Sequence, residues 1–169
     1  MFATWDNSNG VCLFKRDYKF GDTRDPVEWI FSGKIQSHEI EITGICFGES
    51  LDENEQNKIW LFSIGKDWRL YEYDIKESSE DKGLKVVYCY KIEWENSPTA
   101  CIWYPKTDSK EDLLLTVNDD YKMKIWNIAE KAISSWKTVL GPTYGGEIVK
   151  LKWLDIEGNQ DKYLIYSTK

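Results

Sequence analysis

Three residues in the first half of the chain are the ingredients of a hydrolytic site: His38, Ser63 and Asp67. A serine hydrolase needs the serine Oγ within hydrogen-bond reach of an imidazole, a carboxylate on the other ring nitrogen, and an oxyanion hole nearby. The same residue types can instead form a buried hydrogen-bond network that rigidifies a sheet. Which of the two they form depends on the elements that position them.

These three residues belong to a pattern that repeats along the chain. A strand-like run ends on an aromatic residue at Phe14, Tyr73 and Trp126, at similar intervals. Six positions before each aromatic lies a turn residue, and four positions before that lies a small hydroxyl residue. The turn residues are Ser8, Asp67 and Asp120, and the hydroxyl residues are Thr4, Ser63 and Thr116. Offsets kept in phase indicate a repeated structural unit.

Runs of β-branched and aromatic residues between turn signals predict thirteen strands and no helix. The predicted ranges are 1–5, 10–16, 27–35, 41–47, 58–64, 68–75, 84–93, 98–104, 112–117, 122–128, 131–138, 147–154 and 162–168. The run 86–90 is apolar at both alternations, which favours a sheet packed on both faces. The charged segments 50–58, 76–83 and 106–112 are predicted as surface loops.

Composition excludes several classes of function. The net charge of −7 argues against binding to nucleic acid phosphates, which depends on clusters of Lys and Arg. The N-terminus lacks the features of a signal peptide, and no apolar run approaches the ~20 residues of a membrane span. We expect no cofactor and no metal: the acidic segments 22–25 and 52–55 do not follow the EF-hand pattern, and no Cys-x-x-Cys pair is present. The cysteines are predicted to be buried free thiols in a reducing compartment; they are Cys12, Cys46, Cys89 and Cys101.

The stretch from His38 to Ile75 resembles one unit of the WD-repeat β-propeller family. In that family a His before the first strand, a Ser or Thr on the second, an Asp in the next turn and a Trp on the third form a buried hydrogen-bond network. The resemblance implies structural roles for its members here, and no enzymatic activity. The matching positions are His38, Ser63, Asp67 and Tyr73, with Tyr where Trp is usual, and Thr116, Asp120 and Trp126 in a later unit without a His.

The repeat predicts an all-β protein whose chain divides into four units. These are a partial blade at 1–36, full blades at 37–93 and 94–140, and the start of a further blade at 141–169. A closed propeller needs roughly four to eight four-stranded blades, so thirteen strands are too few to close one. We therefore predict an incomplete WD-repeat propeller, with the remaining blades on the same or another chain. An open β-sandwich is the alternative.

A narrower resemblance lies in the segments 135–146 and 163–169. Both are similar to cilia- and flagella-associated WD-repeat proteins at the radial-spoke base, associated with the calmodulin- and spoke-associated complex. This resemblance implies a non-catalytic interaction scaffold in the cytoplasmic axoneme of a cilium or flagellum. Its partners would be axonemal or radial-spoke proteins, without nucleic acid or membrane. The candidate partner contacts are Trp94, Tyr144, Gly141, Gly145 and the acidic loop 52–55.

The sequence leaves two other functions open. One is a general cytoplasmic WD-repeat adaptor in another multiprotein complex, which fold alone does not separate from an axonemal scaffold. The other is a hydrolase that uses Ser63 and His38. The glycine-rich segment 141–146 lacks the Gly-Lys-Ser/Thr of a phosphate-binding loop and is predicted to be a connection.

Overall fold

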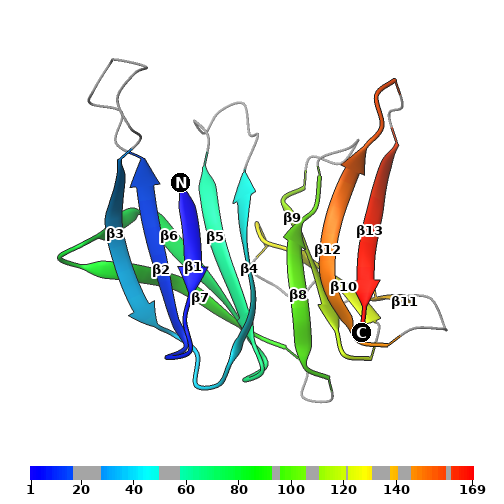
Figure 1. The fold of residues 1–169 in the computed structure, drawn as a ribbon, viewed down its shortest axis with the longest axis horizontal. Coiled ribbons are helices and arrows are strands. Elements are labelled where there is room, and N and C mark those ends of the chain that lie inside the picture. Colours follow the sequence, from blue (N-terminus) through cyan, green and yellow to red (C-terminus); the bar gives the residue numbers. More distant parts are fainter. Residues whose placement is uncertain are drawn as a thin grey trace.

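The computed structural model describes residues 1–16, 28–49, 58–92, 96–105, 111–120, 122–130, 138–140, 146–158 and 161–169. Within these ranges all regular structure is β, with no helix (Figure 1). The strands are β1 (Phe2–Trp5), β2 (Gly10–Arg16), β3 (Trp29–Gln36), β4 (Ile42–Glu49), β5 (Ile59–Gly65), β6 (Arg69–Ser79), β7 (Gly83–Lys91), β8 (Pro98–Trp103), β9 (Leu113–Asn118), β10 (Lys122–Asn127), β11 (Thr138–Leu140), β12 (Ile148–Asp155) and β13 (Lys162–Thr168). The prediction of an all-β chain is confirmed.

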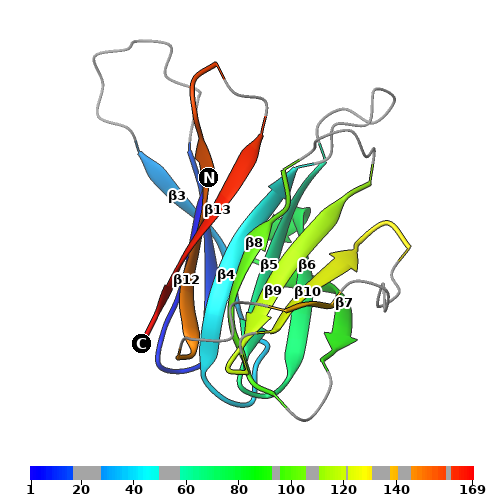
Figure 2. The ribbon, with the colours of Figure 1, turned by 90° about the vertical axis from the view of Figure 1, so that its right-hand side faces the viewer.

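The strands form four antiparallel sheets, each built from consecutive segments of the chain. We name them sheet 1 (β1-β2-β3), sheet 2 (β4-β5-β6-β7), sheet 3 (β8-β9-β10-β11) and sheet 4 (β12-β13). Figure 1 shows them following one another across the molecule, with β4 beside β8, and Figure 2 gives the view from the side. Consecutive pairing of this kind needs only short connections, which antiparallel strands allow.

Sheets 1 and 2 share one apolar cluster. Val11 and Leu13 of β2 pack with Leu61 of β5, Tyr73 of β6 and Leu84 of β7, and all five side chains are buried. Fully burying an aliphatic side chain contributes about 1.5–3 kcal/mol before entropy costs. This cluster fixes sheet 1 against one face of sheet 2.

The other face of sheet 2 packs against sheet 3. Trp60, Phe62 and Ile64 of β5 meet Leu114 of β9 and Trp126 of β10 in a second cluster. Since Leu61 points to sheet 1 and its neighbours point to sheet 3, β5 is buried at both alternations. A central strand between two packed sheets reads as a continuous apolar run for this reason.

Sheets 3 and 4 share a third cluster. Ala100, Leu115 and Val117 of sheet 3 pack on Ile148, with Trp153 of β12 at its border. The Trp153 indole N–H donates to the carbonyl of Trp103 at 2.9 Å. Each sheet is thus packed on the next in chain order.

Two details of the prediction are wrong, and a third lies largely outside the described residues. The run 86–90 lies on β7, an edge strand, where Val87, Tyr88 and Cys89 are exposed; burial at both alternations is found on β5 and β9 instead. The predicted loop 76–83 is largely the end of a hairpin, because β6 continues to Ser79. The eleventh strand covers 138–140, and the predicted span 131–137 lies outside the described residues.

The cysteines are free thiols, as predicted, but they are not buried. Cys89 is exposed, and the other three are half-buried. Cys46 and Cys101 lie on the first strands of sheets 2 and 3, β4 and β8, which contact each other, and a hydrogen bond between the two thiols together with partial burial raises the pKa of Cys46. Strand-like surroundings in the sequence do not tell which strand lies at a sheet edge, so the exposure of Cys89 on the edge strand β7 cannot be predicted from them.

Candidate functional site

The triad residues come together in sheet 2. His38 lies in the connection from β3 to β4, Ser63 is on β5, and Asp67 is in the turn between β5 and β6. The imidazole Nε2 is 2.7 Å from Ser63 Oγ, and Nδ1 is 2.9 and 3.1 Å from the two Asp67 carboxylate oxygens. The three side chains are therefore joined in the order serine, histidine, aspartate.

The network continues beyond the triad at both ends. Tyr73 of β6 places its hydroxyl 2.6 Å from Ser63 Oγ and 2.5 Å from Ser37 Oγ. At the other end, the backbone N–H groups of Glu39 and Arg69 donate to the Asp67 carboxylate at 3.1 and 3.3 Å. The network thus links the β3–β4 connection, β5, the β5–β6 turn and β6.

One arrangement of protons satisfies the whole chain of bonds. With its proton on Nδ1, neutral His38 donates to Asp67 and accepts the Ser63 hydroxyl proton at Nε2. Ser63 then accepts from the Tyr73 hydroxyl, which accepts from Ser37. Each hydroxyl donates once and accepts from one neighbour, except Ser37 at the end. Satisfied buried networks rigidify a fold, whereas half-satisfied ones are costly.

In both acidic groups of the network, Asp67 and Tyr73, burial raises the pKa and hydrogen bonding lowers it. Burial opposes ionisation of Asp67, but its bonds from His38 and from the two backbone N–H groups outweigh this and hold its pKa below the ordinary value. Burial raises the pKa of Tyr73 to about 12, although its bonds to Ser37 and Ser63 act the other way. Asp67 is therefore an anion at neutral pH, and Tyr73 a neutral donor.

The triad is closed to substrates in this conformation. Ser63 is 0% exposed and His38 is 2% exposed. The Tyr73 hydroxyl is also hydrogen-bonded to Ser63 Oγ. The ring of Tyr71 stands edge-on to the imidazole, with centroids 4.7 Å apart. An attacking serine needs space for a carbonyl and its oxyanion beside Oγ. The geometry of a triad is present, but its position favours a structural role.

Three contributors were missed in the sequence. Ser37 extends the network, the Glu39 backbone caps Asp67, and Gly65 makes room for the ring. A Cβ at Gly65 would lie 2.5 Å from His38 Nδ1 and 2.9 Å from Asp67 Oδ1. The only sequence signal for Gly65 is its place two residues after Ser63, where a strand directs both residues to the same face.

Sheet 3 carries only a fragment of this network. The Trp126 indole N–H donates to Thr116 Oγ1 at 2.8 Å. Asp120 does not join them: its carboxylate accepts from the Lys122 backbone N–H at 3.2 Å and lies 2.8 Å from the Lys122 ammonium. Asn118, fully buried, occupies the position that corresponds to Gly65. Of the three residues grouped in the sequence, Thr116 and Trp126 are thus hydrogen-bonded to each other, whereas Asp120 bonds to Lys122.

Sheet 1 has no counterpart of the network among its described residues. The Ser8 hydroxyl donates to Asp6 at 2.5 Å, and Thr4 contacts only the neighbouring carbonyl of Trp5, at 3.5 Å. Phe14 has no polar atom to offer its neighbours. The hydroxyl, turn and aromatic positions thus recur in sequence, but they form the full network only where the His is present.

The predicted partner contacts Trp94, Tyr144, Gly141 and Gly145, and the acidic loop 52–55, lie outside the described residues. In the part of the chain that is described, no group of three or more His, Cys, Asp or Glu side chains is arranged to hold a metal. No helix in the described ranges has the length and apolarity that crossing a bilayer requires.

The lowered pKa of Asp67 predicts acid-sensitive stability. Because the folded-state pKa lies below the unfolded value of about 3.9, the carboxylate stabilises the fold above that value, and this contribution is lost as pH falls through the folded-state pKa. We expect the free energy of unfolding to decrease less between neutral and acidic pH in Asp67→Asn than in the parent. Urea titrations at a series of pH values measure this. Glu41→Gln, which changes an exposed carboxyl, is the control; equal pH slopes in the parent and Asp67→Asn would contradict the prediction.

The fold and the site together define an all-β protein of sequentially packed antiparallel sheets, with a buried histidine-centred network in the second sheet. The chain is 44% identical to "Cilia- and flagella-associated protein 251" of Tetrahymena thermophila, over an alignment of 185 positions that covers 99% of the chain. It is 36% identical to the mouse protein of the same name over 144 positions and 83% of the chain. The chain is thus homologous to cilia- and flagella-associated proteins.

The Chlamydomonas reinhardtii protein of that name is 25% identical over 150 positions and 85% of the chain. The chain spans 19% of the length of the Tetrahymena relative, 10% of the mouse relative and 17% of the Chlamydomonas relative. No family model matches the chain.

Proposed function

We propose that the chain is part of a WD-repeat β-propeller that serves as a non-catalytic interaction scaffold in the ciliary axoneme, at the base of the radial spoke. The observation that carries the ciliary part is the similarity to cilia- and flagella-associated proteins along 99% of the chain. The radial-spoke position rests on the resemblance of the segments 135–146 and 163–169 to spoke-base proteins.

The arrangement of the sheets supports a propeller. The first strands of sheets 2, 3 and 4 are β4, β8 and β12, and each contacts the next. Thr43 of β4 donates to the carbonyl of Pro98 in β8 at 2.7 Å, which fixes two of these strands together. Four-stranded sheets arranged radially around an axis have this contact pattern.

The exposed apolar faces of the two end sheets, sheet 1 and sheet 4, support an incomplete propeller. On the face of sheet 1 that points away from sheet 2, the rings of Phe2 and Phe14 are stacked with centroids 4.6 Å apart. Phe2 also contacts Trp29, and Phe14 also contacts Phe31. Sheet 4 exposes Leu154, Tyr163 and Ile165 at 39–50%. Open repeat stacks expose such apolar ends, and further blades would cover them. We propose that the remaining blades come from the same polypeptide or from another chain.

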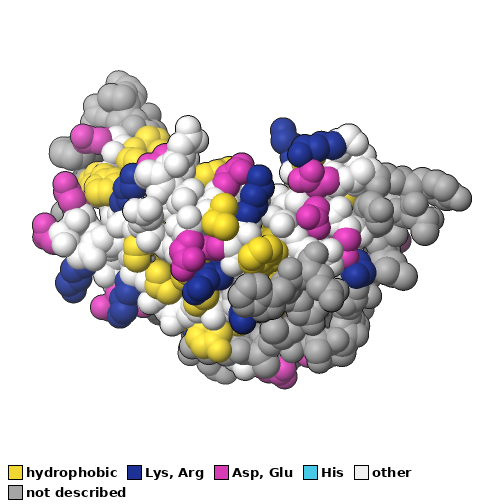
Figure 3. Space-filling model, turned by 90° about the horizontal axis from the view of Figure 1, so that it is seen from below, with side chains coloured by type: hydrophobic (Ala, Val, Ile, Leu, Met, Phe, Trp, Pro, Cys, Tyr) yellow, Lys and Arg dark blue, Asp and Glu magenta, His cyan; other side chains and the backbone are white. Residues whose placement is uncertain are grey.

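The burial of the triad supports a scaffold rather than a hydrolase. A serine that is 0% exposed and hydrogen-bonded on both sides fits a residue that fixes register. The end of the molecule seen in Figure 3 shows mixed acidic and basic side chains with separate hydrophobic areas, and no histidine is visible there. Protein interfaces combine an apolar core with a polar rim, and hydrophobic areas set among charged side chains are compatible with that arrangement.

Detergent extraction of ciliated cells that express the tagged protein tests the proposal. We expect the protein to remain with the demembranated axoneme and to be released only by high salt, together with spoke components. Full release into the detergent-soluble fraction would overturn the axonemal proposal and favour a general cytoplasmic WD-repeat adaptor. Because Ser63 is buried, we expect no labelling by a serine-reactive probe. Labelling that is lost in Ser63→Ala would instead favour a hydrolase function.

A further inference from the structure

Two cysteine thiols meet where sheets 2 and 3 come together. Cys46 lies on β4 and Cys101 on β8, and these are the first strands of their sheets. Both side chains are half-buried and pack against the apolar cluster between the two sheets. A hydrogen bond joins the two thiols. The residues are far apart in sequence, so the packing of one sheet on the other makes this contact.

The backbones of β4 and β8 approach each other closely on both sides of the two thiols. A Cβ at Gly44 would lie 3.4 Å from the backbone nitrogen of Cys101, and a Cβ at Gly48 would lie 2.4 Å from the ring of Trp103. Gly44, Cys46 and Gly48 alternate along β4 and therefore point to the same face of the strand. A disulfide requires Cα atoms about 4.4–6.8 Å apart. Two glycines that flank Cys46 bring the strands close enough for such a bond.

The surroundings of the pair keep it reduced under ordinary conditions. The hydrogen bond to Cys101, together with partial burial, raises the pKa of Cys46 well above its ordinary value. Cys46 is therefore a protonated thiol at neutral pH. Because the thiolate is the nucleophile, such a thiol reacts slowly. The pair is thus suited to respond to a high level of a small, uncharged oxidant.

We propose that Cys46 and Cys101 are a redox modification site, at which hydrogen peroxide converts the two thiols into a disulfide that joins sheet 2 to sheet 3. One thiol attacks the peroxide and its O–O bond breaks, which gives a sulfenic acid and one molecule of water. The second thiol then attacks the sulfenic sulfur, and the S–S bond forms as the hydroxyl group leaves with the S–H proton as a second water. The two thiols together lose two electrons and two protons, and the peroxide is reduced to two molecules of water.

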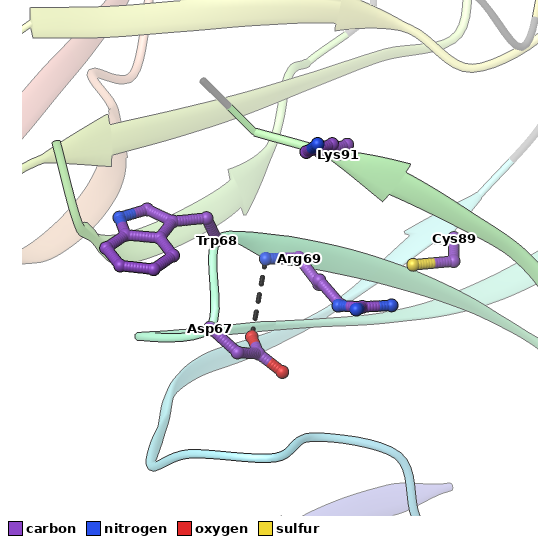
Figure 4. A pocket seen from close by; sticks show the side chains of 5 residues that line it. All are labelled: Asp67, Trp68, Arg69, Cys89 and Lys91. Atoms are coloured by element: carbon purple, nitrogen blue, oxygen red, sulfur yellow. Dashed lines mark hydrogen bonds between the residues drawn. The ribbon is translucent and has the colours of Figure 1, made fainter. Parts of the chain in front are cut away.

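The exposed thiol of Cys89 lacks a comparable partner. It lines a hollow of about 470 Å³ at the end of sheet 2, together with Asp67, Trp68, Arg69 and Lys91 (Figure 4). No second cysteine is among the described residues that line this hollow. Oxidation there gives a sulfenic acid without a thiol beside it to form an intramolecular disulfide. Cys89 is therefore the internal comparison for the pair.

The disulfide changes how firmly two neighbouring sheets are held together. It adds a covalent bond between β4 and β8 and closes a long loop of the chain, which restricts the unfolded state. In reducing compartments, disulfides of this kind are usually transient and report on the redox state. The site goes beyond the proposed scaffold function and does not depend on it, because it needs only the packing of sheet 2 on sheet 3.

Mass spectrometry of the full chain after treatment with hydrogen peroxide tests the proposal. The parent carries Cys89→Ser, because the exposed thiol would otherwise link two chains. We expect a mass lower by two hydrogen atoms and a cross-linked peptide that contains Cys46 and Cys101. The oxidised protein should melt about 10 °C above the reduced protein, and dithiothreitol should reverse both changes. The cross-link is measured in the parent, so it does not depend on the stability of further variants.

Matched serine variants in the same background complete the test. Cys46→Ser and Cys101→Ser each remove one sulfur and should abolish both the cross-link and the shift in melting temperature. Cys12→Ser changes a half-buried thiol of sheet 1 and should leave both in place. The proposal is overturned if peroxide leaves the mass unchanged, if it adds oxygen to either sulfur without linking the two, or if the link involves Cys12. None of these outcomes bears on retention by the axoneme, so the two proposals fail separately.

Discussion

Replacing His38 by alanine is expected to destabilise the fold by about 3 kcal/mol. The substitution removes the donor to a buried carboxylate and the acceptor for Ser63, and it leaves the volume of the imidazole unfilled. Leaving a buried polar group without its partner costs about 1–3 kcal/mol, and more when the group is charged. The expected cost stays near the upper end of that range because two groups lose a partner, although Asp67 keeps two backbone N–H donors. Urea denaturation at neutral pH measures the change.

Two variants calibrate that result. Lys66→Ala, at an exposed residue of the same turn, should change the free energy of unfolding by less than about 0.5 kcal/mol. Tyr73→Phe keeps the ring but removes the hydroxyl between Ser63 and Ser37, and its cost should lie between the two. An unfolding midpoint of His38→Ala close to that of Lys66→Ala would show that the network contributes no stability.

Gly65 offers a coupling test of the same site. Its hypothetical Cβ lies 2.5 Å from His38 Nδ1, so Gly65→Ala should displace the ring and weaken its bonds to Asp67 and Ser63. In the His38→Ala background the closest of its contacts is removed, and those at 2.9 Å from Asp67 Oδ1 and 3.1 Å from the Glu41 carbonyl oxygen remain, so its cost should shrink. The two costs are then non-additive, as is typical of residues in direct contact.

The sequence predicts the strands well because strand formation is largely local. Alternating or continuous apolar runs between turn residues place twelve of the thirteen strands close to their observed bounds, and the eleventh, predicted at 131–138, is described only over 138–140. The network around His38 is also readable, since each member occupies a fixed offset in a repeated unit. Its completion by Ser37 is not readable, because that contact spans 36 residues to Tyr73 and depends on how the β3–β4 connection turns.

What the sequence does not carry is the position of each strand within the stack. Val87 and Leu61 sit in equally apolar runs, yet Val87 lies on an edge strand and is 41% exposed, while Leu61 is 0% exposed between sheets. Asp120 shows the same limit at the level of a site. It occupies the turn position of Asp67, but it pairs with Lys122, because a turn aspartate joins the network only through a histidine ring.

The contact between sheets 1 and 2 gives the second large effect, at a place with no sequence signal. Gly33 of β3 has a φ of 134°, beside the irregular register between β2 and β3. A Cβ there would lie 2.6 Å from the carbonyl carbon of Gly83 and 2.7 Å from the backbone nitrogen of Leu84. Both obstacles are backbone atoms, which cannot rotate away as a side chain does.

Gly33→Ala is therefore expected to destabilise the fold by about 3 kcal/mol, from backbone strain and from the separation of sheet 1 from sheet 2. For a domain of this size that lowers the melting temperature by roughly 6–12 °C. Hydrogen exchange should speed up first in β1–β3, since the clash acts on the packing of Val11 and Leu13.

Gly158→Ala is the matched control, because Gly158 has a φ of 80° but no atom within 4 Å of its hypothetical Cβ. It isolates the backbone term, about 1 kcal/mol. The difference between the two variants measures the steric cost of bringing the backbones of sheets 1 and 2 together. Equal costs would mean that sheet 1 moves aside freely and that this close approach does not hold the two sheets in place.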